Sequence, residues 1–243
     1  MYSGIEPTCF TDPGGHFLDL LFNFTKLINM SVFLPMFPLR MVVFPGEPVN
    51  LHIFEPRYRQ LIHECEAQGT TFGIPPFLDN KVMPIGTELE LLAIAKTYSD
   101  GKMDIRTRGV GRFRIEEFFA KAPNRLYGGA EIERLPEPEN VPFEPILVQK
   151  IAIGVTKLYE VLRIKRDPPP SDAPLRSFEL AHHVGFSQEQ EYEFLEIDDE
   201  IARQEFLVNH LDRLLPVVEE MENLRKRVQM NGHFKNVIPP DIS

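Results

Sequence analysis

The sequence has no tryptophan among its 243 residues and only two cysteines, Cys9 and Cys65. Two cysteines cannot form a disulfide framework or a cysteine-rich zinc site, so a reducing compartment fits best. No apolar run reaches the roughly 18–20 residues that cross a bilayer. The most hydrophobic early stretch, residues 17–28, contains Asp19 and Lys26 and lacks the basic segment and cleavage site of a signal peptide. We therefore expect a soluble cytoplasmic protein without a membrane partner.

Motifs for nucleotide binding and hydrolysis are also missing. The sequence has no G-x-x-x-x-G-K-[ST] phosphate loop, no H-E-x-x-H, no C-x-x-C and no G-x-S-x-G. Gly109 and Gly111 begin a G-x-G pattern, but the third glycine of a dinucleotide fingerprint is absent. His182 and His183 are adjacent, and on a helix they would point about 100° apart and could not readily chelate one ion. We expect no catalytic residue, no cofactor and no metal.

The apolar pattern from Val32 to Pro136 is that of β-strands. Residues 89–98 form a long predicted strand, and Asp100-Gly101 after it predicts a hairpin, because that turn needs a positive φ angle. The return strand places Met103, Ile105 and Thr107 on one face. Gly109 and Gly111 then predict a break or a bulge in the strand.

One helix interrupts these strands. Pro56 suits its first position, since the missing N–H would be unpaired there, and Gly69 is placed to end it. Four residues recur at the i, i+3, i+4, i+7 spacing of a buried helix face: Tyr58, Leu61, Ile62 and Cys65. We interpret Cys65 as a small core residue, with a reactive thiol as the alternative.

The period becomes 3.6 beyond a proline- and acid-rich segment, residues 136–142. A first helix carries the apolar stripe Leu147, Ile151, Val155, Leu158 and Leu162. A second is predicted over residues 175–184, and a third begins with the capping-box pair Ser187 and Gln190. The fourth and longest helix is predicted over residues 199–230, bent at Pro216. Its stripe has four-three spacing: Leu207, Leu211, Leu214, Val218, Met221 and Val228.

These patterns predict an α+β fold in which a β-rich half precedes a helical bundle. We divide the chain into an N-terminal extension over residues 1–30, a β-rich subdomain over 31–136, a linker over 137–145, a helical bundle over 146–232 and a tail over 233–243. The extension has no clean period, and we expect it to be poorly ordered; an amphipathic arm over residues 17–27 is the alternative.

Three segments closely resemble the opening signature of the Lon protease N-terminal (substrate-binding) domain: LPMFPLR at residues 34–40, VFPG at 43–46 and LHIFEPRY at 51–58. Residues 109–115, GVGRFRI, are similar to a later strand of that domain. Met41 departs from the pattern, because the family commonly has an acidic residue there. The resemblance spans about residues 33–230 and implies a PUA-like twisted β-sheet or pseudo-barrel followed by a helical subdomain.

The resemblance also implies a function. In full-length Lon this region captures unfolded or damaged polypeptides and helps to assemble the hexamer, while the ATPase and the Ser–Lys protease follow it. We expect neither of those parts here, and therefore a non-enzymatic module that recognises unfolded or extended polypeptide. Its expected partners are such polypeptides, a separate ATP-dependent protease and, through the bundle, a second copy.

Candidate binding residues come from the signature segments. Phe44, Phe54, Arg57 and Tyr58 would line an apolar groove for exposed hydrophobic segments. The alternative interpretation, which we favour, is that these aromatic residues fill the core while the prolines set turns. A small-molecule pocket under Phe44 and Phe54 is a third interpretation.

An arginine ridge carries the rival hypothesis. Arg106, Arg108, Arg112 and Arg114 put four guanidinium groups on outward strand positions, and PUA-like folds include RNA binders. The binding candidates therefore also include Arg106 and Arg112. The chain has 36 acidic against 26 basic residues, a formal charge of −10. This charge favours a solvated face and makes a nucleic-acid partner the weaker prediction.

Overall fold

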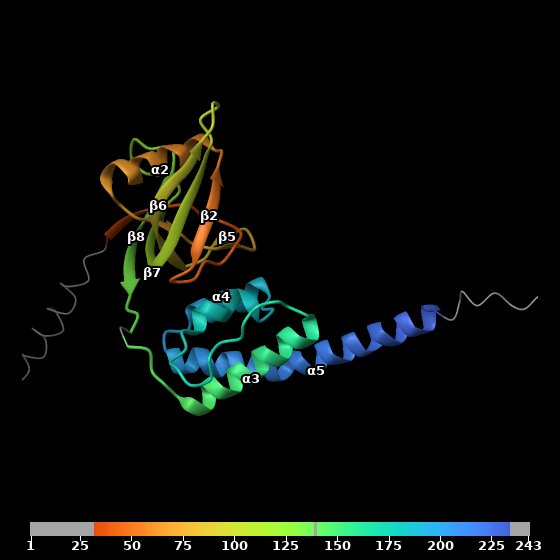
Figure 1. Cartoon of the computed structure of the whole chain (residues 1–243). Helices are drawn as coiled ribbons and strands as arrows, with labels where there is room; N and C mark the ends of the chain where they lie inside the picture. The colour runs from red at the N-terminus through yellow and green to blue at the C-terminus, as the bar shows by residue number, and fades with distance from the viewer. Residues whose placement is uncertain (1–31, 139, 234–243) are drawn as a thin grey trace, which may run out of the picture.

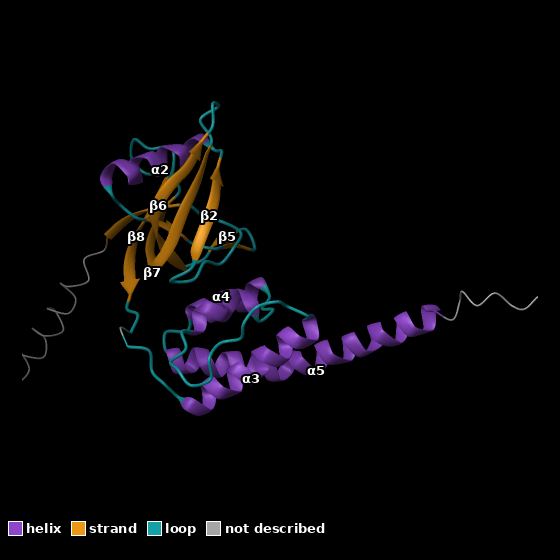
Figure 2. Cartoon of the chain, viewed as in Figure 1, coloured by secondary structure: helices purple, strands orange, loops and turns teal. Residues whose placement is uncertain are grey.

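The computed structural model describes residues 32–138 and 140–233. The extension predicted over residues 1–30 and almost all of the predicted tail lie outside the described residues. A β-barrel that carries one helix is followed by a helical subdomain below it (Figures 1 and 2). This order confirms the predicted α+β fold with a β-rich half before a bundle.

Five strands close into the barrel. The sheet order is β2-β7-β6-β3-β1-β8, and β7 also pairs with β8, which closes the strands from β7 to β8 into a ring. The remaining strand, β2, pairs antiparallel with the first part of β7. Strands β4 and β5 form a separate small hairpin. The strands are β1 (Val32–Met36), β2 (Pro48–Ile53), β3 (Phe72–Ile74), β4 (Phe77–Leu78), β5 (Lys81–Val82), β6 (Ile85–Thr97), β7 (Met103–Phe119) and β8 (Gly128–Leu135).

Strand β7 pairs with β2 and β6 in its first half and with β6 and β8 in its second half, and it contains a bulge. Its partner β6 shifts register so that Glu88 faces Gly111 and Leu89 faces Gly109, which leaves Val110 as the extra residue. Gly109 is required there, because a Cβ on it would collide with the carbonyl oxygen of Phe44. The predicted break is therefore a bulge, and the strand continues to Phe119.

The predicted hairpin and barrel helix are confirmed. Gly101 has a φ of 80° in the turn between β6 and β7. Helix α2 (Pro56–Gln68) ends at Gly69, which has a φ of 63° and donates its N–H to the carbonyl of Cys65. The face predicted for α2 is buried in the barrel core, and Cys65 is part of that core, with 2% of its surface exposed.

The helical subdomain contains α3 (Pro145–Leu162), the 3₁₀ helix η1 (Ser177–His183), α4 (Gln188–Glu196) and α5 (Glu200–His233). The capping box of Ser187 and Gln190 is present at α4. The helix predicted over residues 175–184 is a shorter 3₁₀ helix. Helix α5 runs through Pro216 as predicted and three residues past the predicted end.

The apolar stripes of α3 and α5 are buried only in part. Ile151, Val155 and Leu158 are in the core, but Leu162 is 50% exposed. On α5, Leu207 and Leu211 are buried, whereas Met221 and Val228 are 65% and 69% exposed. The outer part of the α5 stripe does not pack in the bundle, because this part of α5 extends past the other helices (Figure 1).

Barrel and helical subdomain share one hydrophobic core. Val42, Phe44, Ile85 and Leu135 of the barrel side pack with buried residues of α3, η1, α4 and α5. The inner barrel core is a separate cluster around α2. The two subdomains are thus joined through side chains as well as through the connecting segment.

Candidate functional site

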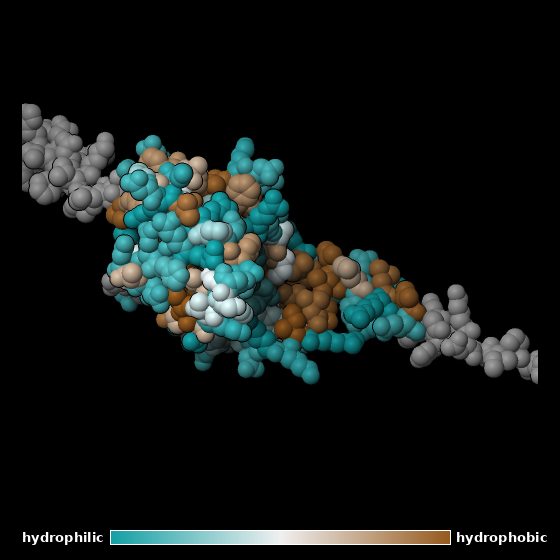
Figure 3. All heavy atoms as spheres, turned by 90° about the horizontal axis from the view of Figure 1, so that it is seen from above, coloured by the Kyte–Doolittle hydropathy of each residue, from teal (hydrophilic) through white to brown (hydrophobic). Residues whose placement is uncertain are grey.

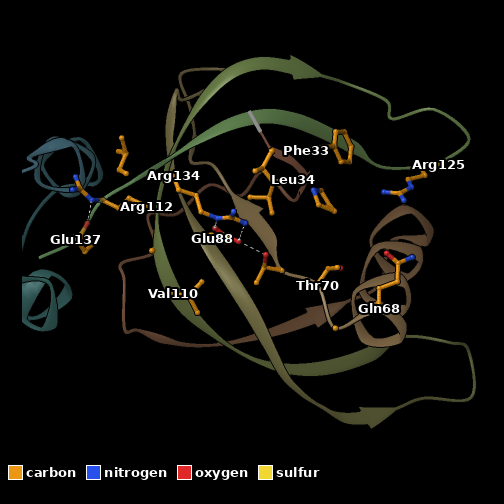
Figure 4. Close-up of a pocket in the computed structure, with 16 residues that line it drawn as sticks. Phe33, Leu34, Gln68, Thr70, Glu88, Val110, Arg112, Arg125, Arg134 and Glu137 are labelled. Carbon is orange, nitrogen blue, oxygen red and sulfur yellow. Dashed lines mark hydrogen bonds and ion pairs between the residues drawn. The ribbon is translucent and has the colours of Figure 1, made fainter. Parts of the chain in front are cut away.

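A cavity of about 620 Å³ opens on the barrel where β1 separates from β3 (Figure 4). Strand β1 pairs with β8 over its whole length, but within the described ranges it pairs with β3 only between Met36 and Gly73. The loop from α2 to β3, residues 68–71, forms the opposite wall. The other lining residues come from β6, the β7 bulge and β8: Glu88, Val110, Gly111, Arg112, Arg134 and Leu135, together with Arg125 and Glu137.

Apolar side chains are available on the rim of this cavity. Phe33 of β1 is 41% exposed and Val110, the extra residue of the bulge, is 47% exposed. The Phe33 ring lies against Gly129 of β8, and the Arg125 guanidinium lies 5.9 Å from the ring centre. These contacts hold the ring at the opening, where it can cover an apolar segment of a ligand.

An ion pair between buried Glu88 and exposed Arg134 lies on the cavity wall (Figure 4). Arg134 donates two hydrogen bonds to Glu88, at 2.7 and 2.8 Å, and Thr71 donates a third. Burial raises the pKa of Glu88, but the hydrogen bonds from Arg134 and Thr71 outweigh it and hold that pKa below its ordinary value. The carboxylate is therefore ionised at neutral pH, and the wall combines a fixed charged pair with apolar surface.

Phe44 and Tyr58, two predicted binding residues, are buried. Phe44 is 1% exposed and packs on the rings of Phe178 and Phe194, at 5.4 and 6.0 Å. Tyr58 is 6% exposed and stacks on Phe37 at 3.9 Å. The helical subdomain covers the first and the barrel core encloses the second, so neither offers a surface to a ligand.

Phe54 and Arg57 are exposed but lie outside the cavity. Phe54 is 57% exposed after β2, and Arg57 pairs with Glu55 at 2.8 Å at the start of α2. The signature segments therefore do not gather into one groove. No structural observation tests a binding role for these two exposed residues, and that role stays a prediction.

The arginine ridge is not one exposed face. Arg106, Arg108 and Arg114 are exposed, but Arg112 is 1% exposed. Arg112 points outward from the barrel, as predicted, but the helical subdomain covers that position. It pairs there with Glu137 and with Asp198, at 3.2 Å for the latter, and lies over the ring of Phe178. Arg112 therefore joins the two subdomains, and Arg106 lies apart from the cavity.

Sequence reasoning missed Phe33, Glu88, Val110 and Arg134. Only Arg112 among the predicted binding residues lines the cavity. The single available signal was Pro35 in the first strand, because proline is confined to strand edges and bulges. The pairing of Glu88 with Arg134 joins residues 46 positions apart, and no local pattern reveals it.

The described residues contain no group of three or more His, Cys, Asp or Glu side chains placed to hold a metal ion. Among the described helices, none is both long enough and apolar enough to span a membrane.

Solved structures with the same fold include two Lon N-terminal domains. The Lon N-terminal domain protein from Xanthomonas campestris matches with a TM-score of 0.58 and 26% identity, over 73% of this chain and 98% of that one. The N-terminal domain of the Mycobacterium avium complex Lon protease matches with a TM-score of 0.54 and 18% identity, over 74% and 98%.

The family follows from the sequence comparison. The ATP-dependent protease La (LON) substrate-binding domain matches residues 33–213, more than half of the chain. The chain belongs to this family, which confirms the resemblance drawn from the signature segments.

Proposed function

We propose that the chain captures unfolded or extended polypeptide in the cavity beside β1, and that any bond cleavage is done by a separate ATP-dependent protease. The membership in a substrate-binding family supports recognition of polypeptide. The location of the site is supported by the edge of β1, which is incompletely paired within the described part of the chain and is the observation that carries the proposal.

The edge offers backbone groups for strand addition. Phe37 donates its N–H to the carbonyl of Gly73 on the β3 side, at 2.8 Å. Alternate residues of a strand direct their backbone groups to the same side, so Phe33 directs its N–H and C=O toward the cavity. Pro35, at the intervening position, has no N–H, which restricts uncontrolled pairing of this edge. An extended segment of a client would add as a strand at Phe33.

The side chains around the edge suit such a segment. Phe33 and Val110 provide apolar surface on the rim, while Glu88 and Arg134 satisfy each other on the wall. Successive side chains of an added strand point to opposite faces, so every second side chain of the client would meet this surface. A folded protein rarely exposes such a strand, which would give preference for unfolded chains.

A nucleic-acid function has less support. Burial removes Arg112 from the ridge on which that hypothesis rested, and Arg114 lies 3.4 Å from the carboxylate of Glu133. The formal charge of −10 opposes broad binding to phosphates.

The test compares one protein in two states. A permanently unfolded probe, reduced and carboxymethylated ribonuclease, and native ribonuclease are titrated against the full chain. We expect binding of the unfolded form alone. Phe33→Ser should weaken it by roughly tenfold, because the variant removes exposed aromatic surface at the edge. Phe54→Ser is the matched control, since Phe54 is exposed outside the cavity.

Equal or negligible binding of both ribonuclease forms would reject capture of unfolded polypeptide. A loss with Phe54→Ser and none with Phe33→Ser would keep the function and move the site to the start of α2. Thermal unfolding of both variants shows that their fold is retained.

A further inference from the structure

The outer part of α5 carries an apolar seam that nothing described covers. Val217, Met221, Leu224 and Val228 are 55%, 65%, 51% and 69% exposed. Their spacing is four, three and four residues, which is the repeat of a two-heptad coiled-coil seam. Figures 1 and 3 show this part of the helix projecting beyond the bundle, with apolar residues along it.

The seam faces away from the contact between α5 and α3. Glu219 of α5 meets Lys157 of α3 at 2.6 Å, and Glu222 meets Arg163, directly after α3, at 3.1 Å. At about 100° per residue, those glutamates lie on roughly the opposite side of α5 from the seam. The packing inside the subdomain therefore leaves the seam open along its length.

Apolar surface continues from the seam toward α3. A groove of about 330 Å³ lies between the end of α3, η1 and α5, beside Leu214 and Val218. Leu162 and Ile164, at its α3 side, are 50% and 41% exposed. A helix that covered the seam would also cover part of this groove, which enlarges the apolar area available to a partner.

We propose that the seam binds the same seam of a second copy, with the two α5 helices antiparallel. The four-three-four spacing reads the same in both directions. A two-fold axis between residues 222 and 223 therefore places Val217 opposite Val228 of the second copy, and Met221 opposite Leu224. Each apolar residue then meets an apolar residue.

The charges beside the seam favour this pairing. Glu220 and Arg227 flank the seam on the same side, seven residues apart. In an antiparallel pair these flanking positions face each other, so Glu220 of each copy meets Arg227 of the other, and the contact occurs twice. The antiparallel arrangement also places the two bundles at opposite ends of the paired helices, whereas a parallel one would crowd them together.

Two heptads bury less surface than a stable interface requires, so we expect a dissociation constant on the order of 10–100 µM. Sedimentation equilibrium of the full chain should show a monomer–dimer equilibrium over this concentration range. Leu224→Glu should abolish the dimer, because it places the carboxylate of each copy opposite the apolar Met221 of the other copy. Asn223→Glu is the matched control, since it adds the same charge away from the seam. Circular dichroism should show both variants folded.

Charge reversal tests the direction of pairing. Glu220→Arg alone should weaken the dimer by roughly three- to tenfold, and Glu220→Arg with Arg227→Glu should restore it. Restoration by Arg225→Glu instead of Arg227→Glu would indicate parallel helices and overturn the proposal. A wild-type chain that stays monomeric to about 1 mM would also overturn it. A Leu224→Glu variant that dimerises normally would overturn it too. The same holds if this variant dimerises normally and loses only the binding of unfolded ribonuclease.

Discussion

The guanidinium of Arg112, on β7 of the barrel, donates a hydrogen bond to the backbone carbonyl of Leu195, at the end of α4, at 2.9 Å. It donates a second to the carbonyl of Ile197 at 3.0 Å and pairs with Glu137. These three acceptors belong to the helical subdomain or to the segment that leads into it. Arg112 of the barrel thus helps to hold the bundle in position, together with the shared hydrophobic core.

Arg112→Met is expected to destabilise the protein by about 2 kcal/mol, because it removes the side-chain donor to the Leu195 carbonyl and leaves Ile197 and Glu137 with Arg203 alone. Urea denaturation measures the free energy of unfolding. Arg108→Met, on an exposed position of the same strand, is the control and should change it by less than about 0.5 kcal/mol. Equal effects of the two variants would contradict the role assigned to Arg112.

Gly109→Ala should cost about 1–3 kcal/mol, since its Cβ would press on the carbonyl oxygen of Phe44 and backbone cannot move aside cheaply. Gly111→Ala is the matched control, because no described atom would lie within 4 Å of its Cβ. Thermal unfolding of the pair separates a steric effect from a general cost of alanine in the bulge. A tolerated Gly109→Ala would reject the close approach.

Glu88 makes stability depend on pH in the acidic range. Its folded pKa lies below the ordinary value of 4.5, so its contribution is present above that pH and is lost as the pH falls through the folded pKa. Glu88→Gln should therefore be less stable than the wild type at pH 7, and the difference should shrink below about pH 4.5. A difference that does not change with pH would show that the ion pair with Arg134 contributes nothing.

His182 makes stability depend on pH in the alkaline range. Hydrogen bonds to Glu191 and Glu47, at 2.7 and 3.2 Å, raise its pKa to about 10. The charged imidazole stabilises the fold fully below the unfolded pKa near 6.5, and this stability is lost as the pH rises through about 10. His182→Gln should cost about 1 kcal/mol at pH 7, limited by solvent screening, and less at pH 10. Denaturation at pH 6, 8 and 10 measures the difference.

Local patterns predicted those parts of the fold that depend on local chemistry. The Asp100-Gly101 turn, the helix between Pro56 and Gly69 and the capping box at Ser187 all form as expected. Each is decided by residues within a few positions of one another. The fold class and the family also follow from long, ordered segments of sequence.

The site depended on long-range contacts and was not predictable in the same way. The bundle covers Phe44, in a loop of the barrel, and Arg112, on a strand, and the sequence does not say which barrel positions a later helix will cover. The cavity exists because, in the described structure, β1 pairs with β3 only at Met36, and the earlier residues of β1 lie apart from β3. The exposed end of the α5 stripe likewise reflects how far α3 extends beside it, which the spacing of apolar residues does not reveal.

The common core of barrel and bundle limits how the protein can be divided. A fragment that ended near residue 136 would leave Val42, Phe44, Ile85 and Leu135 facing water, and their apolar area would favour aggregation. Grafting the proposed recognition surface onto another protein therefore requires transplanting both halves together, and barrel and helices should melt in a single cooperative transition.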